Sequence, residues 1–116
     1  MIDLSHITQL HETLDENIDP IIPYIGHVHI ANAVLKEGAP AYGDQHPRFG
    51  FDYGEVDKKL LAAFLQKLFD IGYLGDKKRP VVAFEVKPWG NESSEMILAG
   101  AKRFLNEAWQ LVSLPS

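Results

Sequence analysis

The chain has 116 residues, 46% of them hydrophobic and 23% charged, and this composition predicts one globular domain over residues 1–116. Its net charge of −5 offers no basic surface to nucleic acid or to an anionic membrane, and no apolar run is long enough to cross a bilayer. It contains no cysteine, which excludes disulfides and thiolate ligands, so a bound metal must use His and carboxylate groups; we expect a cytoplasmic protein.

The first third of the chain predicts a strand end, a helical region and a complete strand. Residues 1–4 fit the end of a strand, and Ser5 is a candidate N-cap for the helix that follows. A later isoleucine series keeps helical spacing but is interrupted by two prolines: Ile18, Ile21, Ile22 and Ile25. The segment His27–Val34 then predicts a strand with His27 and His29 on one face.

A long loop, Lys36–Gly54, separates this strand from a helix predicted over Val56–Tyr73. Loops of this length are usually functional or disordered, and its aromatic residues favour an ordered one. The helix has a continuous apolar stripe: Val56, Leu60, Leu61, Phe64, Leu65, Leu68 and Phe69. Asp57 suits its N-terminus, while Gly72 and Gly75 close it.

The last part of the chain predicts a basic turn at residues 76–79, a strand at Pro80–Pro88 and a helix at Ser93–Val112. Strand alternation puts Val82, Phe84 and Val86 on one face and Val81, Ala83, Glu85 and Lys87 on the other. The predicted inward face of the helix comprises Met96, Ile97, Ala101, Phe104, Leu105, Ala108 and Trp109. Alternating strands and helices predict an α/β fold with a parallel sheet.

Polar residues gather where the predicted strands end. Ligands of parallel α/β structures bind beyond the carboxyl ends of the strands. Three imidazoles and three carboxylates are expected to converge on that rim: Asp3, His6, His29, Asp44, His46 and Glu85. Imidazole together with carboxylate oxygen suits a divalent first-row ion such as Mn²⁺, Co²⁺, Fe²⁺ or Zn²⁺, and suits Mg²⁺ less well.

Most of these residues also have a simpler structural explanation, and those explanations stay open. For His27 and His29 the simpler explanation is an interior position with hydrogen bonds to neighbours. For Asp3 and His6 it is an ordinary helix start, and for Asp44 and His46 it is a turn. Glu85 is harder to explain in this way. A carboxylate between two apolar strand residues costs free energy unless it meets a cation or several hydrogen-bond donors.

The order and spacing of several short motifs resemble those of the xylose-isomerase-like (β/α)8 barrels. That family includes sugar isomerases, sugar and ketose 3-epimerases, inosose-processing enzymes and endonuclease IV. The motifs are Asp3-Leu-Ser-His6, His27-Val-His29, Gly43-Asp44-Gln45-His46 followed by Phe49-Gly50, the helix end Ile71–Gly75, and Phe84-Glu85-Val86. The resemblance spans nearly the whole chain and implies a partial TIM barrel of about three C-terminal βα units, strands six to eight.

The resemblance also implies a metal site. Asp3, His29 and Glu85 would bind a divalent metal (Mn, Co, Zn or Mg), and Asp44 with His46 would form a candidate second site. In such a site the metal polarises a sugar carbonyl, so that a carboxylate can remove the adjacent proton and form an enediolate.

Four residues receive catalytic or substrate-binding roles by the same resemblance. Glu85 would be one of the two carboxylates that move the proton, and His6 would contact substrate oxygens or a second metal. Arg48 would hold a phosphate or carboxylate of the substrate. Trp89 would form an apolar wall for a sugar face, or else serve as a packing residue.

The leading expectation is therefore the C-terminal segment of a metal-dependent isomerase or epimerase that acts on a sugar or sugar phosphate. About three of eight barrel units are expected and the family's other catalytic Glu has no counterpart, so the isolated chain is expected to lack turnover. We also expect it to associate with itself or with the missing N-terminal barrel half. Two alternatives stay open: an endonuclease IV-like abasic-site nuclease, and a non-catalytic interaction or metal-binding module.

Overall fold

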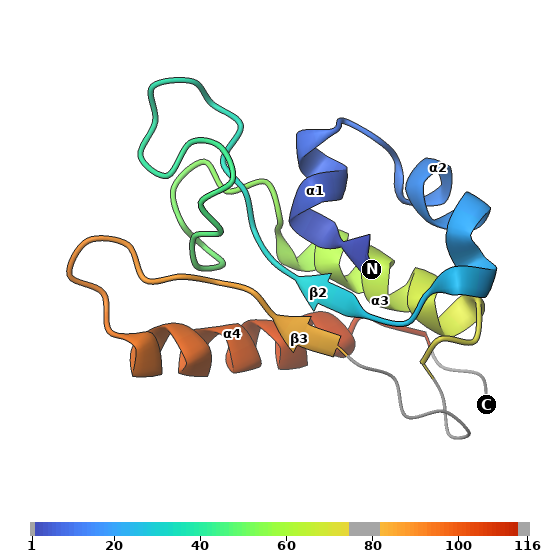
Figure 1. Ribbon diagram of the computed structural model, residues 1–116. Coiled ribbons are helices and arrows are strands. Elements are labelled where there is room, and N and C mark those ends of the chain that lie inside the picture. The colour runs from blue at the N-terminus through green and yellow to red at the C-terminus, as the bar shows by residue number, and fades with distance from the viewer. Residues whose placement is uncertain (1, 75–81, 114–116) are drawn as a thin grey trace.

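The computed structural model describes residues 2–74 and 82–113 and shows a mixed α/β architecture (Figure 1). Its three parallel strands follow the order β1-β2-β3: β1 (Ile2–Asp3), β2 (Val28–Ile30) and β3 (Val82–Phe84). The helices are α1 (Leu4–Gln9), α2 (Leu14–Ile18), α3 (Lys58–Asp70), α4 (Ser94–Trp109) and a 3-10 helix, Asp19–Tyr24. The predicted parallel α/β sheet is confirmed, and its assignment to a TIM barrel stays a prediction.

Helix α1 begins two residues earlier than predicted. Asp3, not Ser5, is its N-cap: the Asp3 backbone is extended and its side chain accepts a hydrogen bond from the Ser5 amide. Ser5 is buried in the first turn and also donates its hydroxyl to the Asp3 carboxylate. The predicted cap was wrong because the aspartate at the strand end accepts from the Ser5 amide and gains from the helix dipole, so the helix begins before Ser5.

The predicted isoleucine helix is divided into two short helices. Thr13 and Glu16 form a reciprocal capping box that starts α2, a signal that the isoleucine spacing alone did not reveal. Pro20 lies in the first turn of the 3-10 helix that follows, where the missing proline N–H does least harm. Ile18, at the junction, is fully buried.

The strands are shorter than the sequence pattern suggested. Only Val28–Ile30 of the predicted strand at residues 27–34 pairs as a ladder, and Val34 forms isolated bridges to the long loop. Beyond Ile30 a side chain takes the place of a strand partner: the Asn32 carboxamide oxygen accepts the hydrogen bond of the Ala33 amide. Among the described residues 82–88 only Val82–Phe84 is a strand; residues 75–81, with the start of the predicted strand, lie outside the described part, as does Met1.

The two long helices cover one face of the sheet. Their caps are Asp57 for α3 and Ser93 for α4. Buried side chains of α3 share one core with the strand residues Ile2, Val28 and Ile30: Leu61, Phe64, Leu65 and Leu68. Figure 1 shows α3 and α4 behind the sheet in that view.

The inward face of α4 differs from the predicted set. Ile97, Ala101 and Ala108 are buried, whereas Met96 is 75% and Trp109 38% exposed. Met96 directly precedes the buried Ile97, and Trp109 directly follows the buried Ala108. One position turns a side chain about 100° around the helix axis, and here away from the core.

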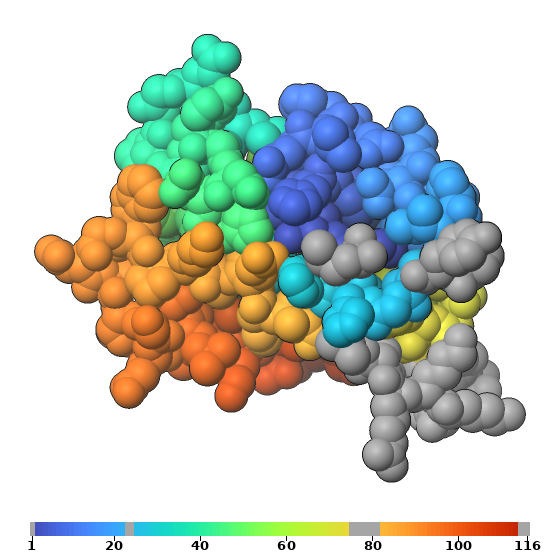
Figure 2. All heavy atoms as spheres, viewed as in Figure 1, coloured from blue at the N-terminus to red at the C-terminus, as the bar shows by residue number. Residues whose placement is uncertain are grey.

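On the opposite face of the sheet, no helix of the described residues lies across the strands. Ala83 and His27 are exposed there, and His29 is half-buried. Figure 2 shows the same side, where the cyan segment of β2 and the pale orange segment of β3 reach the surface. No helix in the described residues is long and apolar enough to span a membrane.

Candidate metal centre

Strand register places three of the predicted ligands on the uncovered face. Asp3, His29 and Ala83 are partners across β1, β2 and β3, so their side chains share that face. Glu85 is two residues beyond Ala83, and its amide still donates to the Ile30 carbonyl at 3.0 Å. The parallel sheet thus brings Asp3, His29 and Glu85 together at its carboxyl edge, as predicted.

Asp3, His29 and Glu85 form a group with metal-ligand spacing. One ligand atom from each lies within 4.8 Å of the others. His29 Nδ1 is 2.8 Å from Glu85 Oε2, and these two side chains are 28% and 40% exposed. His29 and Glu85 are therefore accessible from the uncovered face, whereas Asp3 is the buried member of the group.

The Asp3 carboxylate has one satisfied oxygen and one orphan. Oδ1 accepts from the Ser5 amide at 2.9 Å and from the Ser5 hydroxyl at 2.6 Å. Oδ2 is buried and has no hydrogen-bond partner among the described residues. A buried carboxylate oxygen without a donor costs free energy, and a cation would remove that cost.

Asp3 remains ionised despite its burial. Burial, the largest single influence, would raise the pKa of Asp3, but its neighbours, with the Ser5 hydrogen bonds first among them and the nearby His6 also contributing, lower that pKa below its ordinary value. An anionic carboxylate is the form that binds a divalent cation.

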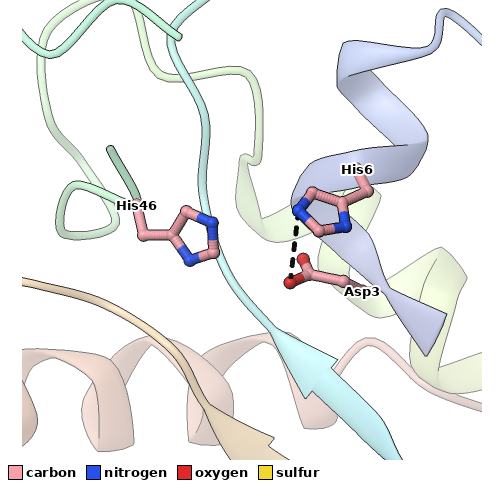
Figure 3. Close-up of side chains that lie close together, drawn as sticks. All are labelled: Asp3, His6 and His46. Atoms are coloured by element: carbon pink, nitrogen blue, oxygen red, sulfur yellow. Dashed lines mark ion pairs between the residues drawn. The ribbon is translucent and has the colours of Figure 1, made fainter. Parts of the chain in front are cut away.

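A second group shares Asp3 with the first. Ligand atoms of Asp3, His6 and His46 also lie within 4.8 Å of one another, and Figure 3 shows these side chains meeting between α1 and the long loop. His6 Nε2 is 3.9 Å from Asp3 Oδ2 and 3.4 Å from Asp44 Oδ1. The predicted pairing of Asp44 with His46 is also present, because Asp44 Oδ1 is 2.5 Å from His46 Nε2.

His46 has a defined ring orientation. Its Nδ1 is 3.0 Å from the Glu85 carbonyl oxygen, which only accepts, so Nδ1 carries a hydrogen. In a neutral His46 the lone pair is then on Nε2, the atom that faces Asp44. A lone pair and a carboxylate repel each other, so this contact requires a proton or a cation.

Asp44 is held at the rim by a residue that the sequence analysis did not single out. Gln9 Nε2 donates to Asp44 Oδ1 at 3.2 Å. This hydrogen bond is the largest influence that lowers the pKa of Asp44; His46 and His6 add to it, against a smaller opposing effect of burial. The available signal was spacing, because Gln9 follows His6 by three residues and shares its helix face.

Arg48 and Trp89 contact residues that belong to neither ligand group. Arg48 Nε donates to Glu92 Oε2 at 2.8 Å, and Arg48 lines a pocket of about 320 Å³ against α4 that none of the predicted ligands lines. The Trp89 ring packs edge-on against Phe51, with centroids 6.1 Å apart. Their substrate roles stay predictions.

The geometry gives a polar, open-faced cluster of carboxylates and imidazoles at the carboxyl edge of a parallel sheet, with one buried oxygen unsatisfied. Such a cluster can hold a divalent cation and leave positions for an oxygen ligand on the solvent side. Comparisons with protein-family models, with curated proteins and with solved structures found no match to this chain.

Proposed function

We propose that this chain is the metal-binding, C-terminal segment of a divalent-metal-dependent sugar or sugar-phosphate isomerase or epimerase. The observation that carries the proposal is the buried Asp3 carboxylate. Its Oδ2 has no hydrogen-bond partner among the described residues, and one of its oxygens lies within 4.8 Å of ligand atoms of His29 and Glu85. The motif resemblance to xylose-isomerase-like barrels supplies the reaction class, and the geometry supports the ligand set.

The donor set favours Mn²⁺, Co²⁺ or Zn²⁺. One imidazole and two carboxylates are ligands that these ions accept, whereas Mg²⁺ prefers oxygen and water alone. A bound ion of this kind would polarise the carbonyl of a hydroxy-carbonyl sugar.

The side chains have complementary tasks in this proposal. The Glu85 carboxylate is 40% exposed on the open face, where it can accept a proton from the substrate carbon. His6 is 46% exposed at the rim and can donate a hydrogen bond to a substrate oxygen. Asp3 is buried, and in this proposal it holds the cation as well as capping α1.

A second candidate function is an abasic-site nuclease resembling endonuclease IV. The second ligand group, Asp3 with His6 and His46 beside Asp44, favours it. Its weakness is electrostatic, because phosphate contacts dominate DNA affinity and the chain has a net charge of −5. Strand cleavage at an abasic site would favour this function, and interconversion of ketose epimers would favour the first.

Calorimetric titration of the metal-free chain with Co²⁺ or Mn²⁺ tests the proposal directly. We expect saturable binding by the wild type and its loss in His29→Ala and Glu85→Gln, because each change removes a ligand. Glu55→Gln is the matched control, since Glu55 is exposed on the loop and belongs to neither group. Unchanged affinity in Glu85→Gln would refute the assigned role of Glu85.

A further inference from the structure

Asn32 connects three segments around the proposed metal centre. It lies just beyond β2 and is fully buried. Its Nδ2 donates to the Arg48 carbonyl in the long loop at 3.1 Å. Its Oδ1 accepts from the Ala33 amide and from the Val56 amide, both at 2.9 Å. One side chain thus links the end of β2, the middle of the loop and the approach to α3.

Only an amide satisfies this set of partners. Nδ2 must donate to a carbonyl while Oδ1 accepts from two amides, and a carboxylate or an aliphatic group cannot do both. Because all of these groups are buried or half-buried, loss of any one bond leaves a polar group unsatisfied.

Gly54 leaves room for this arrangement. A Cβ atom at Gly54 would lie 2.4 Å from Asn32 Nδ2 and 3.0 Å from the Phe51 carbonyl oxygen. Gly54 does not have a positive φ, so the requirement for glycine here is close approach rather than backbone conformation. The returning part of the loop therefore packs directly on the Asn32 amide.

The loop that Asn32 holds carries His46 in a strained conformation. His46 has a φ of 50°, and Ala41 and Tyr53 in the same loop are also left-handed. Such backbone costs free energy in a non-glycine residue and persists only where the surroundings hold it. The surroundings of His46 are the Glu85 carbonyl and the Lys87 amide on one side and the Asn32–Arg48 bond two residues away on the other.

We propose that Asn32 is a positioning residue of this metal centre: its carboxamide fixes the long loop so that the His46 imidazole stays against Glu85. The proposal rests on the proposed function only in that it describes the cluster as a metal centre. The geometric claim concerns the metal-free chain and can be tested without a metal.

The test is the imidazole signal of His46 in the metal-free full chain, measured by long-range ¹H–¹⁵N NMR. In the wild type we expect a protected Nδ1–H, because Nδ1 donates to the Glu85 carbonyl. In Asn32→Asp we expect that signal to be lost, because a carboxylate faces the Arg48 carbonyl and repels it. Gly54→Ala should cause the same loss by pushing the amide out of place.

Val34→Ala is the control, since Val34 is fully buried near the same loop but makes no contact through the Asn32 amide. It should lower the stability while the His46 signal is retained. A retained signal in Asn32→Asp would overturn the proposal, and so would global unfolding of both Asn32→Asp and Gly54→Ala, which would make the amide a general folding residue. If the His46 signal responds as stated but the wild type binds no metal, the positioning role stands and the proposed metal function fails.

Discussion

The two carboxylate oxygens of Asp3 have different partners. Oδ1 caps α1 through Ser5, whereas Oδ2 is buried and has no hydrogen-bond partner among the described residues. Because Asp3 ends a strand and starts a helix, its backbone is fixed on both sides and the side chain has little freedom. The cap therefore also orients a candidate metal ligand.

Two substitutions should separate these roles of Asp3. Asp3→Asn keeps a capping oxygen, so we expect little loss of stability but loss of metal binding. Asp3→Ala removes the cap as well and should lower the unfolding free energy by about 1–2 kcal/mol. Urea denaturation and metal titration of both variants check this. Equal destabilisation by the two substitutions would contradict the capping role.

Glu92 ties the long loop to the turn before α4. Its carboxylate accepts from Arg48 Nε and from the Trp89 amide. Partial burial, the largest influence, would raise the pKa of Glu92, but the Trp89 amide and the Arg48 guanidinium outweigh it and lower the pKa below its ordinary value of 4.5.

This lowered pKa fixes the sign of a pH effect. The folded state prefers the anion, so the stabilisation is present above the ordinary pKa and is lost as the pH falls through the folded pKa. Glu92→Gln should therefore cost up to about 1 kcal/mol at neutral pH, and the difference should disappear in acid. The measurement is urea denaturation of the wild type and of Glu92→Gln, at neutral pH and in acid. A deficit that persists in acid would show that the carboxylate charge is not responsible.

At the scale of the element, α4 shows how one helical position decides burial. Ile97 is 6% exposed and packs in the core, whereas its neighbour Met96 is 75% exposed. Both are large and apolar, so composition does not distinguish them. What distinguishes them is the phase of the helix, which the Ser93 cap and the contact with α3 set.

This phase predicts unequal effects of two similar substitutions. Ile97→Ala should lower the unfolding free energy by about 2–4 kcal/mol, because it removes buried methylene groups and leaves a cavity. Met96→Ala, the matched control, should change it by less than about 0.5 kcal/mol. Denaturant unfolding of the two variants measures the difference. A similar loss in both would mean that α4 packs in a different rotation.

At the scale of the whole molecule, the fold is one-sided. The apolar face of the sheet is covered by α3 and α4, and the face with the candidate ligands is not (Figure 1). In the described residues β1 and β3 are edge strands, each with a single neighbour. Unpaired strand edges and an open inner face promote association with another sheet.

We therefore expect the isolated chain to self-associate. Light scattering should give a mass above that of the monomer, falling on dilution. If association uses the uncovered face, Ala83→Lys should shift the population towards the monomer, because Ala83 is exposed there. Ala63→Lys, on the exposed side of α3, is the control. A monomeric mass at every concentration would contradict the expectation.

The sequence alone determined which faces the side chains share. Period-two alternation placed His27 with His29, and Ala83 with Glu85, on one face of their segments, and the predicted helical stripe includes four of the buried residues of α3: Leu61, Phe64, Leu65 and Leu68. These features follow from local backbone geometry, which fixes side-chain direction whatever the rest of the chain does. The rule that parallel strands end at one edge predicted that polar residues gather there, and the resemblance to xylose-isomerase-like barrels implied the set Asp3, His29 and Glu85, which the structure brings together.

Only the tertiary structure decided where the long loop goes. Three of the contacts that fix its path join residues far apart in the chain. His46 bonds to the Glu85 carbonyl, Arg48 pairs with Glu92, and Asn32, just beyond β2, donates to the Arg48 carbonyl. No local periodicity encodes such contacts, because a loop without regular structure can take many paths of similar local energy. Packing and buried hydrogen bonds select one path, and these exist only once the chain has folded.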